Sequence, residues 1–224
     1  IGAKRDLVFL YDNLGSINVR RLMDDQALNN YKQALWFAKE TNFDEGNIFI
    51  NLELSEFYRQ TGQIKKGWAY FKRALLVAKK LNLKYHNFDC VMEEIEYLLL
   101  SGILKKADSL SKNLVTQLKF EHNPAYRVYS FIYRAKVLAA LRKYNQAHWL
   151  YNRAHTIIKS LPANQITGEI YYLRGVAYKK EGNLKEALKM FLTANEIFEE
   201  TGNLRYLEKI DKEIAVTKAT FPEK

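Results

Sequence analysis

The stretch Gly182–Phe191, with the sequence GNLKEALKMF, and the Ala194 that follows it decide the fold of this chain. A glycine of this kind commonly ends a helix. The helix that follows carries a small residue at Ala187, an aromatic ring four positions later and a second small residue three positions after the ring. The same three positions recur at steps of 40 residues back to the start of the chain, without an insertion or a deletion. The sequence is therefore predicted to consist of repeats.

Four columns of residues define the repeat. The first small column reads Ala27, Gly67, Ala107, Ala147 and Ala187. The aromatic column reads Tyr31, Phe71, Ser111, Tyr151 and Phe191. The second small column reads Ala34, Ala74, Leu114, Ala154 and Ala194. A column on the preceding helix reads Gly15, Ser55, Ile95, Ala135 and Gly175. Because paired helices pack at about 8–10 Å, small residues belong at their crossing. The columns thus indicate packing rather than chemistry.

The columns predict an all-α fold of five helix-turn-helix repeats followed by a capping helix. The repeats are expected at residues 7–41, 47–81, 87–121, 125–161 and 167–200, and the capping helix at 204–220. Each repeat buries its apolar face against its neighbours, so we expect residues 1–224 to form one domain, closed by the last helix. Gly62, Gly102 and Gly182 suit the left-handed position that ends a helix. Asp6 and Asp24 are expected to cap the first two helices.

The repeat motif resembles that of the tetratricopeptide repeat (TPR) family. The first repeat contains Tyr11-x-x-Leu14-Gly15 and then Ala27-x-x-x-Tyr31-x-x-Ala34. The unit of 40 residues is similar to that of cell-polarity adaptors and of bacterial peptide-sensing and signalling proteins. The resemblance covers about residues 7–200 and implies an α-α superhelix, a solenoid in which the first helix of each repeat lines a concave groove.

The chain departs from the family pattern in two places. Lysines occupy the column of the family's late proline: Lys39, Lys79, Lys119 and Lys159. The third repeat has Ile95, Ser111 and Leu114 where the other repeats have small, aromatic and small residues. Large and small residues have exchanged places, so we expect the total volume of this repeat to be kept.

Composition and motifs argue against an enzyme. The four histidines and the single Cys90 form no set of metal ligands, and there is no phosphate-binding loop or nucleophile elbow. We therefore expect no metal, no cofactor and no catalytic residue. The longest apolar run, Tyr97–Leu100, is far too short to span a membrane. A lone cysteine excludes an intrachain disulfide and favours a cytoplasmic compartment. Because the sequence begins at Ile1, we expect a fragment or a processed product.

The groove implied by the resemblance is acidic in the middle and aromatic towards the C-terminus. The predicted partner-binding residues are Asn13, Glu53, Glu56, Asp89, Glu93, Glu96, Tyr129, Tyr133, Lys136, Tyr172 and Lys179. The carboxylates run against the net charge of +10. The leading hypothesis is therefore a scaffold for protein–protein interaction that binds a peptide or helix with a basic segment. The sequence does not identify this partner.

Two alternative functions stay open. The chain could be the sensor of a larger signalling protein or transcription regulator. It could also associate with nucleic acid through lysines on the second helices, since two columns of them repeat every 40 residues: Lys32, Lys72 and Lys112, and Lys39, Lys79, Lys119 and Lys159. No aromatic residues interleave for base stacking, which favours a solvated face instead.

Overall fold

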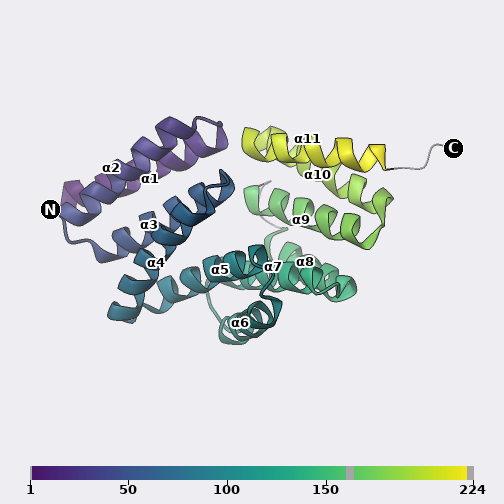
Figure 1. The fold of residues 1–224 in the computed structure, drawn as a ribbon, viewed down its shortest axis with the longest axis horizontal. Coiled ribbons are helices and arrows are strands. Elements are labelled where there is room, and N and C mark those ends of the chain that lie inside the picture. The colour runs from purple at the N-terminus through teal and green to yellow at the C-terminus, as the bar shows by residue number, and fades with distance from the viewer. Residues whose placement is uncertain (1, 160–163, 221–224) are drawn as a thin grey trace. The chain divides into compact units, whose positions relative to one another are not determined.

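The computed structural model describes residues 2–159 and 164–220, and within these ranges the chain is helical and has no β-strand (Figure 1). The predicted all-α fold is confirmed. The predicted end of the fourth repeat at Leu161 lies outside the described residues, as do Ile1 and residues 221–224. The helices are α1 (Gly2–Arg20), α2 (Asp24–Glu40), α3 (Asp44–Gln60), α4 (Ile64–Leu81), α5 (Lys84–Leu100), α6 (Leu104–Gln117), α7 (Pro124–Ala140), α8 (Tyr144–Ile158), α9 (Gln165–Glu181), α10 (Leu184–Thr201) and α11 (Leu204–Ala219).

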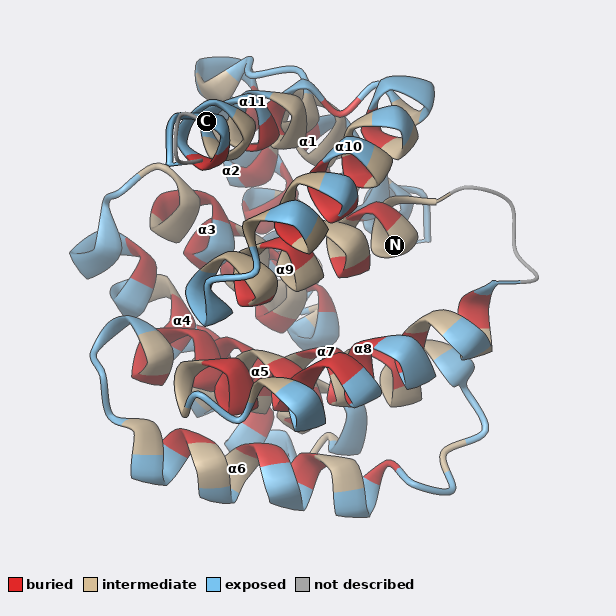
Figure 2. Ribbon diagram, turned by 90° about the vertical axis from the view of Figure 1, so that its right-hand side faces the viewer, coloured by how far each residue is buried: buried red, intermediate tan, exposed pale blue. Residues whose placement is uncertain are grey.

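The chain divides into two compact units, residues 1–97 and 98–224. Unit 1 contains α1 to α4 and most of α5, and unit 2 contains the end of α5 and α6 to α11. Along each helix, buried residues alternate with exposed ones, as expected for amphipathic helices (Figure 2). No helix among the described residues is long and apolar enough to cross a membrane.

Small residues and rings meet within the helix pairs, as the columns predict. In unit 1, a Cβ atom added to Gly15 of α1 would lie 2.6 Å from Cε1 of Tyr31 in α2. In unit 2, a Cβ atom added to Gly175 of α9 would lie 2.5 Å from Cε1 of Phe191 in α10. Both distances are shorter than real Cβ contacts, so glycine is what admits the ring.

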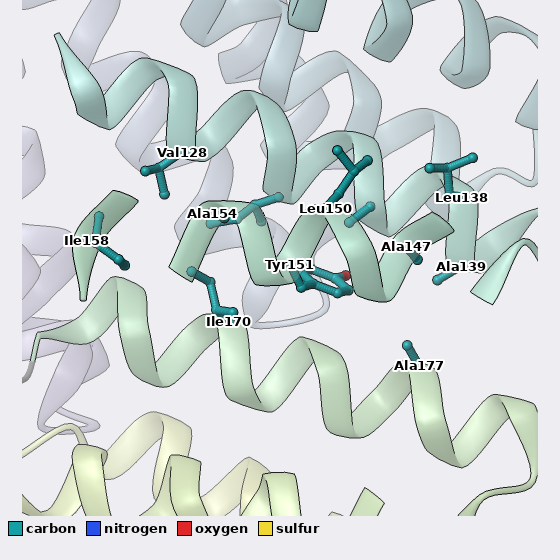
Figure 3. Packing of buried hydrophobic residues seen from close by; sticks show 12 residues of the cluster. Val128, Leu138, Ala139, Ala147, Leu150, Tyr151, Ala154, Ile158, Ile170 and Ala177 are labelled. Carbon is teal, nitrogen blue, oxygen red and sulfur yellow. The ribbon is translucent and has the colours of Figure 1, made fainter. Parts of the chain in front are cut away.

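Each unit has its own core. In unit 1, Tyr31 and Phe71 are almost completely buried, each within an apolar cluster. In unit 2, Tyr151 of α8 lies between α7 and α9, close to Ile170 (Figure 3). The final helix covers the end of this core, because Ile210 is fully buried and Tyr206 stacks on Phe198 of α10 at 4.3 Å. These contacts are what a capping helix requires.

The turns repeat as regularly as the helices. The expected left-handed backbone occurs at Gly62, Gly102 and Gly182, with φ of 79°, 69° and 91°. The same position of the other two repeats is held by Leu22 and Arg142, with φ of 61° and 59°. Side chains disfavour this conformation, so the geometry of the repeat overrides local preference there.

The expected aspartate caps are wrong. Asp6 lies inside α1, which begins at Gly2. Asp24 is the first residue of α2, whose N-cap position is Met23 and has no side-chain hydrogen bond. Aspartate in the first turn still favours the helix through its dipole.

The third repeat contains a polar contact that the volume argument missed. Ser111 is fully buried and accepts a hydrogen bond from Nη1 of Arg134 at 2.9 Å. The same Nη1 donates to Oδ1 of Asp108 at 2.6 Å. The guanidinium of Arg134 from α7 therefore contacts the position where the other repeats carry a ring, and serine serves there as a hydrogen-bond partner.

Candidate partner-binding surface

The first helix of each repeat, α1, α3, α5, α7 and α9, carries the predicted partner-binding residues. In unit 1, Glu93 of α5 accepts hydrogen bonds from Oγ of Ser55 at 2.8 Å and from Nε and Nη2 of Arg59 at 3.2 and 3.1 Å. Nη1 of Arg59 lies 3.6 Å from Oε2 of Glu96. Both glutamates are only 7% exposed. These two carboxylates are therefore buried and join α5 to α3 through Arg59, and their predicted role in binding a partner stays a prediction.

Burial and the ion pair with Arg59 have opposite effects on the pKa of Glu93. Burial raises the pKa of Glu93 to about 7, while Arg59 lowers it. Burial lowers the pKa of the Arg59 guanidinium, but the charges of Glu93, Glu96 and Glu56 outweigh it and raise that pKa. Three donors on one carboxylate stabilise its ionised form. Arg59 thus forms its salt bridges with α5, while its charge also acts on Glu56 of its own helix without a salt bridge between them.

A second group of acids lies on α1 and α3, and we call Asp12, Glu53 and Glu56 the acid cluster. The hydroxyl of Tyr31 donates to Oε2 of Glu53 at 3.2 Å and lies 3.2 Å from Oγ of Ser16. Burial is the main reason that the pKa of this hydroxyl is raised, and the charges of Glu53, Asp12 and Glu56 add to it, so all three carboxylates lie within electrostatic range of Tyr31.

Asp12 is the unusual member of the acid cluster. It is only 6% exposed, and its Oδ1 atom is buried without a hydrogen-bond partner. Burial raises the pKa of Asp12 to about 7. Burial, together with the charges of Glu56 and Asp12, raises the pKa of Glu53 to about 8. Within residues 2–159 and 164–220, no lysine or arginine forms a salt bridge with any of the three.

The remaining predicted residues of unit 1 are accessible to solvent. Asn13 and Glu56 are exposed, and Glu56 accepts a hydrogen bond from Nε2 of Gln60 at 2.7 Å. Asp89 is partly buried, with one carboxylate oxygen 3.6 Å from Nδ1 of His86. Glu53 is partly exposed. These side chains are available to a partner in a way that Glu93 and Glu96 are not.

In unit 2, the predicted residues divide into two groups. Tyr129, Tyr133 and Lys136 of α7 are partly exposed, and Nζ of Lys136 lies 5.2 Å from the centre of the Tyr133 ring. The other two belong to α9 and contact the elements that follow it.

Tyr172 packs edge-on against Tyr206 at 5.6 Å, and Nζ of Lys179 lies 2.7 Å from Oε2 of Glu213 in α11. Burial and the charge of Glu213 raise the pKa of Tyr172 to about 12. Tyr172 and Lys179 therefore help to hold the capping helix, whether or not they also touch a partner.

Sequence reasoning missed Asp12 and Arg59. A signal existed for each of them. Asp12 lies four residues before Ser16, which the family register places on the groove face, and residues at this spacing share a helix face. Arg59 lies three residues after Glu56, which gives the same relation. No pattern showed that Arg59 pairs with α5, or that Oδ1 of Asp12 has no hydrogen-bond partner among the described residues.

The described residues hold no group of three or more histidines, cysteines or acids that could bind a metal ion. His148 is the most enclosed histidine among them: it stacks on Tyr178 at 3.7 Å, and its Nε2 lies 3.3 Å from Oε2 of Glu181. Burial lowers the pKa of His148, so the ring is mainly neutral and serves as a packing group at neutral pH.

Comparison with known proteins supports the fold. No family model matches the sequence, and no curated protein matches it. Among solved structures, the chain is similar to a Signal Transduction ATPase with Numerous Domains (STAND) protein with a tetratricopeptide repeat sensor from Pyrococcus horikoshii, at a TM-score of 0.59 and 15% identity. The match covers 96% of this chain and 33% of that one, so the chain spans about a third of that protein's length.

Two further matches have lower scores. MamA AMB-1 matches at a TM-score of 0.41 and 19% identity, over 85% of this chain and 98% of that one. The P58(IPK) TPR domain matches at 0.41 and 16% identity, over 96% of this chain and 57% of that one. The column contacts, the repeated left-handed turns and the similarity to the tetratricopeptide repeat sensor lead to one conclusion: the chain has the tetratricopeptide repeat fold.

Proposed function

We propose that this chain is a non-catalytic interaction module that binds a peptide or helix of a partner protein along its first helices. The observation that carries the proposal is the acid cluster of α1 and α3. Carboxylates that form no salt bridge within the described residues, on a chain of net charge +10, favour a partner with a basic segment. In unit 2, the partly exposed rings of Tyr129 and Tyr133 offer flat apolar area with a polar hydroxyl, which suits an anchoring role.

Mapping the bound surface tests this proposal. A partner recovered by affinity pull-down is added to the purified chain, and amide hydrogen exchange is compared with and without it. We expect protection to concentrate on the solvent-facing turns of α1, α3, α7 and α9. Protection confined to α2, α4, α8 and α10 would overturn the proposal, because those are the second helices of their pairs.

A second candidate function is the sensor segment of a larger signalling protein. The similarity to the tetratricopeptide repeat sensor of the STAND protein favours it, since that match covers nearly all of this chain but only a third of the other. In this case the same first helices would receive the signal. The complete coding sequence tests the idea, because a neighbouring ATPase or DNA-binding region is expected.

The nucleic-acid alternative rests on the lysine columns. All seven lysines are exposed on second helices or just after them, and Nζ of Lys112 pairs with Asp108 at 2.6 Å. A solvated face with helix C-terminal lysines accounts for this pattern. Binding to nucleic acid tighter than about 10⁻⁶ M at physiological salt would revive the alternative.

A further inference from the structure

We infer that the acid cluster of Asp12, Glu53 and Glu56 binds one cationic side chain, a lysine or an arginine, of an extended partner segment. The inference rests on the proposed function and goes further, because it names the group that is recognised and the residues that recognise it. It does not depend on the aromatic residues of unit 2.

Asp12 provides the first reason. A carboxylate that is only 6% exposed and has an unpartnered oxygen is costly to ionise, unless a donor or a positive charge reaches it. The large majority of buried polar side-chain atoms in proteins have a hydrogen-bond partner. Its neighbours do not supply the partner: the Tyr31 hydroxyl donates to Glu53, and no other group in the described part of unit 1 donates to Oδ1 of Asp12.

The second reason is that the nearby arginines, Arg59 and Arg20, form contacts with other groups. Arg59 pairs with Glu93 at 3.1 Å and with Glu96 at 3.6 Å, both on α5. Nε of Arg20 donates to the backbone oxygen of Ser16 at 3.3 Å. Among residues 2–159 and 164–220, the acid cluster therefore holds up to three negative charges and no salt bridge, although the charge of Arg59 acts on Glu56.

Accessibility provides the third reason. Glu56 is exposed and Glu53 is partly exposed, so a side chain from solvent can reach these two carboxylates, with Asp12 buried near them. A long flexible chain with a terminal charge can pass Glu56 and direct its hydrogens towards Glu53 and Asp12. Lysine and arginine are the residues of that shape, and a carboxylate pair gives either of them charge-assisted hydrogen bonds.

A metal ion is the weaker occupant. The described residues include no arrangement of acids that meets the requirements of a metal site, and the geometry that Mg²⁺ demands is strict. An ammonium or guanidinium group accepts a wider range of oxygen positions.

Binding should be linked to protons. Burial raises the pKa of Asp12 to about 7, and burial together with the charges of Glu56 and Asp12 raises the pKa of Glu53 to about 8, so both carboxyl groups keep a proton up to about these pH values. A cation binds the ionised forms, so it lowers both pKa values and releases protons. Affinity for a cationic side chain should therefore rise between pH 6 and pH 8.5, while affinity for an uncharged analogue should not change.

The direct test uses a small probe and does not need a natural partner. The carboxyl carbons of Asp12 and Glu53 are titrated by NMR in the presence of N-acetyl-lysine-N-methylamide, with N-acetyl-norleucine-N-methylamide and sodium chloride at equal ionic strength as the control. We expect the lysine probe to lower both titration midpoints by up to about one pH unit as it saturates. Superimposable curves with both probes would overturn the inference and would indicate a proton or a water molecule as the only occupant.

The peptide test separates this inference from the proposed function. Two libraries of nine-residue peptides are compared, one with a fixed central lysine and one with norleucine there. Lysine peptides should bind the parent about tenfold more tightly, and Asp12→Asn with Glu53→Gln should remove this difference. The matched control Glu40→Gln, an exposed glutamate of α2, should keep it.

The outcomes are distinct. If peptides protect the first helices but lysine and norleucine bind alike, the proposed function stands and this inference fails. If the lysine preference disappears in the double variant while binding maps to second helices, the cation site stands and the groove proposal fails.

Discussion

At the scale of single residues, burial is the main cause of the raised pKa values of Asp12 and Glu53. Each carboxyl lies where its ionised form is poorly solvated, and their charges oppose one another. In the unfolded chain both would titrate near pH 4. In the folded chain their pKa values are about 7 and about 8. The folded state therefore holds more protons than the unfolded state between these limits.

This difference predicts a stability that falls as pH rises from about 4 to about 8. Asp12→Asn removes one of the ionisations, so its advantage over the parent should grow over that window. At pH 8 we expect a gain of about 1–3 kcal/mol in the free energy of unfolding. Urea denaturation at pH 5 and pH 8 measures it, with Glu40→Gln as the control. A gain that is equal at both pH values would contradict the account.

Glu93 differs from Asp12 in having a cationic partner, Arg59, which offsets part of the effect of burial on its pKa. Glu93→Lys places a second cation beside Arg59 and should destabilise unit 1 by about 3–5 kcal/mol. Glu56→Lys, at an exposed position of α3, should change stability by less than about 0.5 kcal/mol. Thermal unfolding of both variants tests the contrast. Equal melting temperatures would show that the contact between Arg59 and Glu93 contributes nothing.

At the scale of elements, the third repeat fills the position of the aromatic column with a residue of a different chemical type. α6 carries Ser111 where the other second helices carry a ring, and Arg134 of α7 contacts the serine hydroxyl at 2.9 Å. Ser111→Phe should therefore cost more than simple overpacking. It crowds Leu114 and also separates the guanidinium from its partner.

We expect Ser111→Phe to destabilise the chain by about 1–3 kcal/mol from overpacking, plus about 1 kcal/mol for the lost hydrogen bond. The matched control is Ser109→Phe, because Ser109 is exposed on the same helix. Chemical denaturation of both variants is the measurement. A variant at 111 that melts above the parent would refute this description of the repeat.

The turns between helices offer a test in the stabilising direction. Arg142 is exposed and follows α7 in a left-handed conformation, with φ of 59°. Arg142→Gly should raise stability by about 0.5–1 kcal/mol, because glycine adopts this backbone without strain. Arg142→Ala keeps a Cβ atom and should give no gain. If alanine and glycine stabilise equally, the effect comes from the lost charge and not from the backbone.

At the scale of the whole molecule, the two units present different first-helix faces. Unit 1 offers carboxylates, and unit 2 offers tyrosines with Lys136. Long-range attraction by charges acts mainly on the rate of encounter, whereas buried rings act mainly on the lifetime of a complex. We therefore expect the carboxylates of unit 1 to affect mainly the association rate constant, and the tyrosines of unit 2 to affect mainly the dissociation rate constant. That the whole chain forms one solenoid domain stays a prediction.

We expect Glu56→Lys to slow association with a basic partner and to reduce the salt dependence of the association rate. Tyr133→Ala should instead speed dissociation, at a cost of about 1–2 kcal/mol if the ring is an anchor. Surface plasmon resonance against a partner recovered by pull-down measures both rates. Parent-like kinetics in both folded variants would place the binding site elsewhere.

The sequence by itself determined the features of this protein that depend on local spacing. The 40-residue columns require helix pairs with a small residue facing a ring, and Gly15 against Tyr31 and Gly175 against Phe191 meet that requirement. The glycines at 62, 102 and 182 set the turns, because left-handed backbone is cheapest for glycine. A final amphipathic helix was recognisable because its apolar stripe needs a core to cover.

Only the tertiary structure decided which polar groups of the first helices are compensated. Glu93 and Glu53 occupy the same position of their repeats, yet Arg59 contacts the first from 34 residues away and does not pair with the second. Arg134 reaches Ser111 across 23 residues. Such pairs depend on how far a side chain extends between helices and on what else lies within its reach. The repeat period determines the positions of the helices. It does not determine which of several neighbouring groups a long side chain contacts.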